Sequence, residues 1–205
     1  MKIARSGVGA FAAFVICTCP GIAAGESGRV ADALERPFAA GGRVRLDLSA
    51  GDYQVLAGDD DKIQIEWAVR DVGQFRKVHV NADVGGSSAT IRCQGPSNHF
   101  RVVVRVPSRS DLDLSLTAGD LEVRGIEGHK AIRSRAGDID VDMVRVEDYA
   151  HVAASLWAGD LKAEPLGISK GGLFRSFEWE GKGRYNLSVH LLAGDIRLYT
   201  NTPAK

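Results

Sequence analysis

The sequence predicts an all-β protein, a β-solenoid or parallel β-helix-like stack of short strands joined by repeated corners. Three observations carry this prediction. Apolar and polar residues alternate with a period of two over most of the chain after Arg43, the tripeptide Ala-Gly-Asp occurs five times, and no stretch after residue 24 keeps a helical period over three turns. Alternation is typical of strands with one buried face, and a recurring unit is typical of stacked architectures.

The N-terminus, residues 1–24, is predicted to be a secretory signal peptide that is cleaved from the fold. Lys2 and Arg5 precede an apolar run, Val8–Cys19, and the small residues Ala23 and Ala24 suit a cleavage site. The run is shorter than the roughly 20 residues that a membrane-spanning helix needs. We therefore expect export across the inner membrane to the periplasm or cell surface, without a transmembrane anchor.

Cys93 is the one cysteine outside this segment, because Cys17 and Cys19 both fall within it. A lipid anchor on Cys19 would require a small residue before it, and Thr18 fits that position poorly, so we expect none. Cys93 has no internal partner for a disulfide. Its place two residues after Ile91 in the alternation predicts a buried side chain that behaves as a small hydrophobe.

The rest of the chain is predicted to form one domain. Of the 205 residues 44% are hydrophobic and the formal net charge is zero, which suits a globular core and excludes the clustered basic excess that a nucleic-acid partner requires. Residues 25–42 are assigned to an N-terminal lead-in, whose single candidate helix is Gly28–Pro37. Residues 43–200 are assigned to the β-solenoid domain.

Each Ala-Gly-Asp unit changes the phase of the alternation by one residue. Leu114 and Leu116 lie on the apolar face before one unit, whereas Leu121 and Val123 lie on it afterwards. A straight strand with this slip would turn its apolar face to water, so the unit must be a bulge or corner, with glycine in a conformation that a side chain forbids. The predicted corner residues are Gly51, Asp52, Gly119, Asp120, Gly137, Asp138, Gly159, Asp160, Gly194 and Asp195.

The spacing of the corners predicts stacked rungs, each consisting of a strand, a corner and a second strand. Gly137 follows Gly119 by 18 residues and Gly159 follows Gly137 by 22, but Gly194 follows only after 35. The long interval contains residues 164–185, interpreted as an irregular rung or an insertion packed over one face. The alternative architecture is a bulged antiparallel β-sandwich, in which successive corners would not lie directly above one another.

The chain resembles the bacterial putative-adhesin domains, a family of unknown function expected to form β-solenoids. The resemblance rests on the segments ERPFAAGGRVRLDLSAGDYQV and VVVRVPSRSDLDLSLTAGDLEVRGIEG and on the Gly-Asp-apolar units that follow. It covers about residues 35–200. It implies a secreted or envelope-facing β-rich domain, and it brings no catalytic residues.

The corner aspartates allow two interpretations. Side by side at strand spacing, about 4.8 Å apart, their carboxylates would repel by about 0.9 kcal/mol in water, so each needs a compensating partner. Hydrogen bonds from backbone N–H groups provide one, and a ladder of Ca²⁺ ions would provide another. Calcium-binding β-rolls use a shorter period dense in Gly and Asp, so we favour capping and expect no bound metal or cofactor.

An exposed apolar patch is the candidate binding site. Trp157 and Leu192 occupy the outward position before a corner alanine, where polar residues are expected. Phe174, Phe177 and Trp179, in the long interval, either cover this pair or join it in a binding patch. We favour covering, which predicts a largely buried Trp157.

The sequence therefore favours a non-catalytic, secreted envelope protein, an adhesin-like structural or interaction module whose partner is an envelope protein or glycan. One alternative is a small glycan-cleaving β-helix enzyme that uses Asp138, Asp140 and Asp142, which were placed together on the outward face of one strand. Another is an accessory of an envelope-stress system. The five histidines show no metal-ligand spacing.

Overall fold

Alternating sequence produces strands throughout the part of the chain that the structure, a computed structural model, describes, residues 30–201. The all-β prediction is confirmed, because all the strands join one mixed sheet and the helices are single turns. The predicted signal peptide, with Cys17 and Cys19, lies outside the described residues. The strands are β1 (Val30–Pro37), β2 (Arg43–Ala50), β3 (Asp52–Gly58), β4 (Lys62–Val69), β5 (His79–Gly85), β6 (Ser88–Gln94), β7 (Phe100–Pro107), β8 (Asp111–Ala118), β9 (Leu121–Arg124), β10 (Lys130–Ala136), β11 (Ile139–Asp142), β12 (Tyr149–Ala163), β13 (Ile168–Glu180), β14 (Tyr185–Ala193) and β15 (Ile196–Tyr199). The helices are α1 (Val72–Phe75) and the 3-10 turns η1 (Val146–Asp148) and η2 (Glu164–Leu166).

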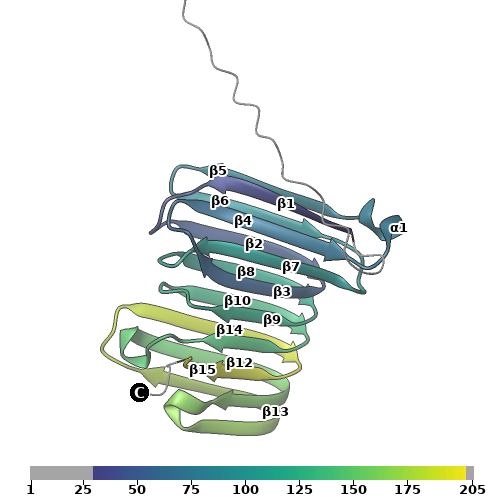
Figure 1. Ribbon diagram of the computed structural model, residues 1–205. Coiled ribbons are helices and arrows are strands. Elements are labelled where there is room, and N and C mark those ends of the chain that lie inside the picture. The colour runs from purple at the N-terminus through teal and green to yellow at the C-terminus, as the bar shows by residue number, and fades with distance from the viewer. Residues whose placement is uncertain (1–29, 202–205) are drawn as a thin grey trace, which may run out of the picture.

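The sheet folds over on itself at β12. Its strand order is β1-β4-β7-β3-β9-β11-β15-β12-β14-β10-β8-β2-β6-β5, with β13 on the free side of β12. Four of the five Ala-Gly-Asp corners carry the chain from one half of this order to the other, as in β2 to β3 or β8 to β9, and the fifth, at Gly159, lies within β12. The two halves enclose a single hydrophobic core, and the strands are stacked along the molecule (Figure 1).

The change of phase at the corners is present in the structure. Leu114 and Leu116 are buried before the corner at Gly119, and Leu121 and Val123 are buried after it. The same switch occurs in the other four rungs. The corner thus keeps both strands of a rung turned toward the core, which is the structural role that the sequence indicated.

The corners lie directly above one another. The N–H of Gly119 donates to the carbonyl of Ala136, and the N–H of Gly137 donates to the carbonyl of Ala193, each at 3.0 Å. A Cβ atom on Gly137 would lie only 2.2 Å from the carbonyl oxygen of Gly119. Strands of neighbouring rungs pair in parallel, which differs from the antiparallel sandwich considered as the alternative.

The rungs do not stack in the order of the sequence. β14 lies between β10 and β12, and β15 lies between β11 and β12 (Figure 1). The rung at Gly194 is therefore inserted between those at Gly137 and Gly159. The long interval before it contains η2 and β13, and β13 runs back antiparallel along the other side of β12. β12 and β13 thus form a hairpin, in which residues 164–185 supply the arm that covers the edge of the last rung.

The predicted helix over Gly28–Pro37 is wrong in the described residues, which form β1. This strand pairs antiparallel with β4, from Val30 opposite Val69 to Pro37 opposite Lys62. Leu34 packs against the core, so long-range pairing overrides the weak helical pattern. A helical turn that the sequence did not indicate, α1, is capped at its N-terminus by Asp71, whose carboxylate accepts the N–H of Gly73 at 2.8 Å.

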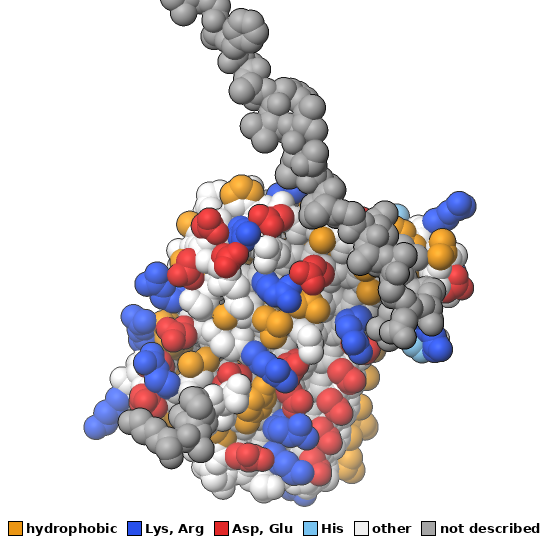
Figure 2. Space-filling view, viewed as in Figure 1, with side chains coloured by type: hydrophobic (Ala, Val, Ile, Leu, Met, Phe, Trp, Pro, Cys, Tyr) orange, Lys and Arg blue, Asp and Glu red, His pale blue; other side chains and the backbone are white. Residues whose placement is uncertain are grey.

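Cys93 is buried, as predicted, and burial raises the pKa of its thiol to about 12. Charged side chains of both signs are interspersed over the face shown in Figure 2, with carboxylates gathered along one edge. Within residues 30–201 no helix has the length and apolar character needed to cross a bilayer.

Candidate functional site

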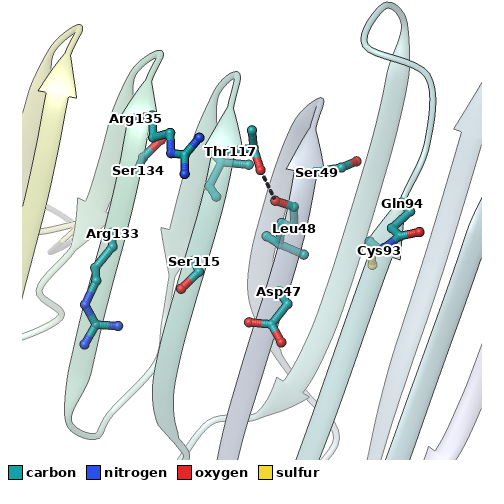
Figure 3. Close-up of a pocket in the computed structure, with 11 residues that line it drawn as sticks. Asp47, Leu48, Ser49, Cys93, Gln94, Ser115, Thr117, Arg133, Ser134 and Arg135 are labelled. Carbon is teal, nitrogen blue, oxygen red and sulfur yellow. Dashed lines mark hydrogen bonds between the residues drawn. The ribbon is translucent and has the colours of Figure 1, made fainter.

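The outward residues of the half-sheet formed by β6, β2, β8, β10, β14 and β12 make two rows that cross the strands. The strand register places the residues before the corner alanines side by side, in the spatial order Ser49, Thr117, Arg135, Leu192 and Trp157. Two residues earlier on each strand lies a second row, Asp47, Ser115, Arg133, His190 and Ser155. Figure 3 shows three members of each row on β2, β8 and β10.

Two hollows lie along these rows. One, of about 500 Å³, extends from Gln94 on β6 to Arg135 on β10 (Figure 3). The other, of about 480 Å³, continues from β10 to Phe174 on β13. Both are lined by Arg133 and Ser134, so they form one continuous depression, called the outer groove below.

An aromatic pair lies at the β13 end of the outer groove. The rings of Trp157 and Phe174 meet edge to face, with centroids 5.6 Å apart and planes at 89°. Trp157 is 53% exposed, Phe174 71% and the neighbouring Leu192 56%. Phe174 has a φ of 54°, a left-handed conformation that is strained for a bulky residue, and such strain is found most often at functional sites.

Two of the five residues predicted for the patch do not contribute to its exposed surface. Phe177 is buried and Trp179 is partly buried against the core, because their antiparallel partners on β12 are the inward residues Ala154 and Val152. The expectation that the aromatic segment buries Trp157 is wrong. β13 brings one ring, Phe174, against Trp157 and leaves both open to solvent.

The charges of the outer groove are predominantly basic. Asp47 is neutralised between Arg45 at 3.4 Å and Arg92 at 3.9 Å. Arg133 pairs with Asp113 at 3.0 Å. Arg135 and Arg175, by contrast, form no ion pair with any described residue.

Three of the five corner aspartates use their carboxylates to bind backbone N–H groups. Asp120 accepts the N–H of Asp138 at 3.3 Å, Asp138 accepts that of Asp195 at 2.9 Å, and Asp195 accepts that of Asp160 at 2.9 Å. Each carboxylate thus bridges to the next rung, as the capping interpretation requires. Among residues 30–201 no group of three or more His, Cys, Asp or Glu side chains has the geometry to hold a metal ion.

Asp138 and Asp140 line one hollow of about 390 Å³, together with Asp52, Asp120 and Glu122, whereas Asp142 is not among its lining residues. Asp138 is exposed, but Asp142 is buried and accepts the N–H groups of Val144 at 2.8 Å and Asn201 at 3.2 Å. β11 ends at Asp142, where these bonds fix the turn that follows. Burial raises the pKa of Asp140, although Arg197 lies 3.3 Å from it. Asp138 is thus the one exposed carboxylate of the three, since Asp140 is partly buried beside Arg197 and Asp142 is buried.

A buried polar cluster at the other end of the rungs was missed by the sequence reading. The Nζ atom of Lys130 is buried and donates to the hydroxyl of Tyr149 at 2.7 Å. Burial lowers the pKa of Lys130 to about 8, with Asp142 the largest opposing influence. The alternation of the sequence could have indicated this cluster, because Lys130 is two residues before the inward Ile132 and so falls on the core face.

The fold has a counterpart among solved structures. The chain matches a putative cell adhesion protein from Clostridium sporogenes with a TM-score of 0.55 and 12% identity, over 82% of this chain and 99% of that one. A putative adhesin from Parabacteroides distasonis matches with a TM-score of 0.27 and 12% identity, over 82% and 70% of the two chains. No protein-family model and no curated protein sequence matches. At this identity the likeness to the Clostridium protein concerns the fold alone.

Proposed function

We propose that this protein is a non-catalytic, adhesin-like binding module of the bacterial cell envelope, a β-solenoid of the putative-adhesin type that is secreted across the inner membrane. Its binding surface is the outer groove, and its partner is a component of the envelope. The fold that it shares with the putative cell adhesion protein from Clostridium sporogenes supports the adhesin-like part of the proposal.

The observation that carries the proposal is the exposed aromatic pair of Trp157 and Phe174. A soluble domain gains stability by burying rings of this size, yet here they stand more than half exposed beside Leu192. Exposed apolar groups that gather in a hollow rimmed by polar residues mark interaction sites. Phe174 also has a left-handed backbone conformation, which is uncommon for a bulky residue and occurs most often at functional sites.

The glycan-cleaving alternative finds less support. Retaining and inverting glycosidases need two carboxyl groups that face the same substrate bond. The carboxylate of Asp142 instead accepts the N–H of Val144 in the turn after β11. The outer groove itself contains one carboxylate, Asp47, which is paired with two arginines. A surface without opposed acids suits binding without cleavage.

The test is retention of the purified secreted protein on washed envelope fractions. Wild type is expected to co-sediment with the fraction, and Trp157→Ala is expected to lose most of that retention. Val72→Ala is the matched control, since Val72 is a 65% exposed apolar residue on α1, outside the outer groove. Equal retention of the two variants would reject the outer groove as the binding surface.

A further inference from the structure

The chemistry of the outer groove also selects a class of ligand, an inference that rests on the proposed function. We infer that the outer groove binds a linear anionic polysaccharide, with carboxylates of the uronic-acid kind, lying across the strands. The reasons come from the groove's length, its hydrogen-bonding groups, its charge and its aromatic end.

The outer groove has the dimensions of a site for a polymer. It runs from β6 to β13 across six strand-to-strand steps, about 29 Å at the usual strand spacing. It crosses the strands along two rows in which every strand contributes an equivalent position. A ligand that repeats along its own axis can use such rows, whereas a compact small molecule would occupy one hollow.

The two parts of the outer groove suit different features of a sugar chain. The end near β6 is lined by Gln94, Ser49, Ser115 and Thr117, which exchange hydrogen bonds with hydroxyl groups. The end near β13 presents the faces and edges of Trp157 and Phe174, on which the apolar face of a pyranose ring can stack.

Charge complementarity favours an anionic chain. Arg135 and Arg175 lie in the two hollows without a carboxylate partner among the described residues. The Nε of Arg175 donates to the carbonyl of Gly171, so a ligand would use its two terminal nitrogens, and a guanidinium can bind a carboxylate with two parallel hydrogen bonds. An anionic lipid surface fits less well. Asp160 and Asp195 are exposed at the corner, three residues beyond Trp157 and Leu192, so a flat anionic surface resting on the corner would meet their carboxylates.

The test is calorimetric titration with galacturonate oligomers, using fully methyl-esterified oligomers of equal length as the neutral probe. Wild type is expected to bind the acidic oligomer at least tenfold more tightly than the esterified one, and more weakly as salt is raised. Arg135→Gln and Arg175→Gln are each expected to weaken binding about tenfold, and Trp157→Ala to abolish it. Arg101→Gln, an exposed arginine on β7 in the other half of the sheet, is the matched control and should bind as wild type does.

Unchanged affinity in both arginine variants, or equal binding of the two oligomers, would overturn the inference. So would binding to phosphatidylglycerol vesicles that the acidic oligomer does not displace. Competition separates this inference from the proposed function. If envelope retention depends on Trp157 but resists the acidic oligomer, the proposed function stands and the polysaccharide is wrong. If the protein binds the acidic oligomer but is not retained on envelope fractions, the polysaccharide inference stands and the proposed function is wrong.

Discussion

At the scale of single residues, the corners depend on glycine for two separate reasons. Gly137 has a φ of 107°, a conformation that side chains rarely adopt, and a Cβ there would collide with the carbonyl oxygen of Gly119. The same close approach recurs at Gly194, where a Cβ would lie 2.1 Å from the carbonyl oxygen of Gly137. A side chain would therefore strain its own backbone and separate two rungs at once.

Gly137→Val is expected to destabilise the protein by several kcal/mol, on the order of 3 kcal/mol or more. Urea denaturation measures the free energy of unfolding directly. Gly86→Val is a suitable control, because Gly86 also has a positive φ, 59°, but a Cβ there meets nothing within 4 Å. A loss for Gly137→Val no larger than that for Gly86→Val would mean that the stacked corner adds no constraint.

Lys130 makes stability depend on pH. In the unfolded chain its pKa is near 10.5, and burial lowers it to about 8 in the folded protein. Between these values the unfolded state holds more protons at this site, so the contribution of Lys130 to stability rises with pH. Cys93, whose pKa is raised to about 12, acts in the opposite direction above pH 9, but equally in any variant that keeps it.

The comparison of wild type with Lys130→Met isolates this effect. Between pH 7 and pH 9.5 the free energy of unfolding of wild type is expected to rise by about 2 kcal/mol relative to that of the variant. The rise above pH 8 is about 1.4 kcal/mol per pH unit. Urea denaturation of both proteins at the two pH values gives the difference. Parallel pH profiles would show that Lys130 keeps its charge in the fold, stabilised by Tyr149 and Asp142.

At the scale of elements, β13 both covers the edge of β12 and is itself an edge strand of the sheet. It covers β12, and its own outer side has no partner strand in the described structure. The Nζ of Lys170 donates to the carbonyl of Ser176, and the Nε of Arg175 donates to the carbonyl of Gly171, each at 2.7 Å. Long basic side chains that bind their own strand's carbonyls discourage another chain from adding to the edge.

Two aromatic residues of this hairpin are expected to differ sharply in their effect on stability. Phe177→Ala removes a buried ring that faces Ala154 and should cost about 3 kcal/mol or more. Trp157→Ala removes a ring that is half exposed and should cost about 1 kcal/mol. Chemical denaturation of the two variants checks both values. Similar losses would indicate that Trp157 is covered in solution.

The hairpin also shows how far sequence alone could reach. Alternation predicted which residues of the corner strands face the core, because one buried face imposes a period of two. Phe174 and Phe177 are three residues apart, so alternation puts them on opposite faces of the strand. It could not show which of the two faces packs on the core, because that depends on the pairing of β13 with β12. β1 was missed for a related reason, as its partner β4 follows about 30 residues later.

At the scale of the whole molecule, the rungs are equivalent in sequence but not interchangeable in position. Five similar corners gave no indication that the rung at Gly194 lies inside the stack, because any rung could follow any other at the same spacing. The neighbour relation of Trp157 and Leu192 was predicted from the equivalence of their corners, and the pairing of Ala158 with Ala193 confirms it. The outer groove arises from this order, since it brings Arg133 on β10 next to His190 on β14.

The inserted position of β14 and β15 also constrains how the chain reaches this structure. A chain that folds from its N-terminus can complete the rungs at Gly51, Gly119 and Gly137 in turn. β12 and β13 then form a hairpin that has no docking site until residues 185–199 arrive between it and β11. Folding of the last third is thus a single late event that closes a long loop. Truncation after Gly183 would remove the middle of the stack rather than its end, so the protein cannot be shortened rung by rung from its C-terminus.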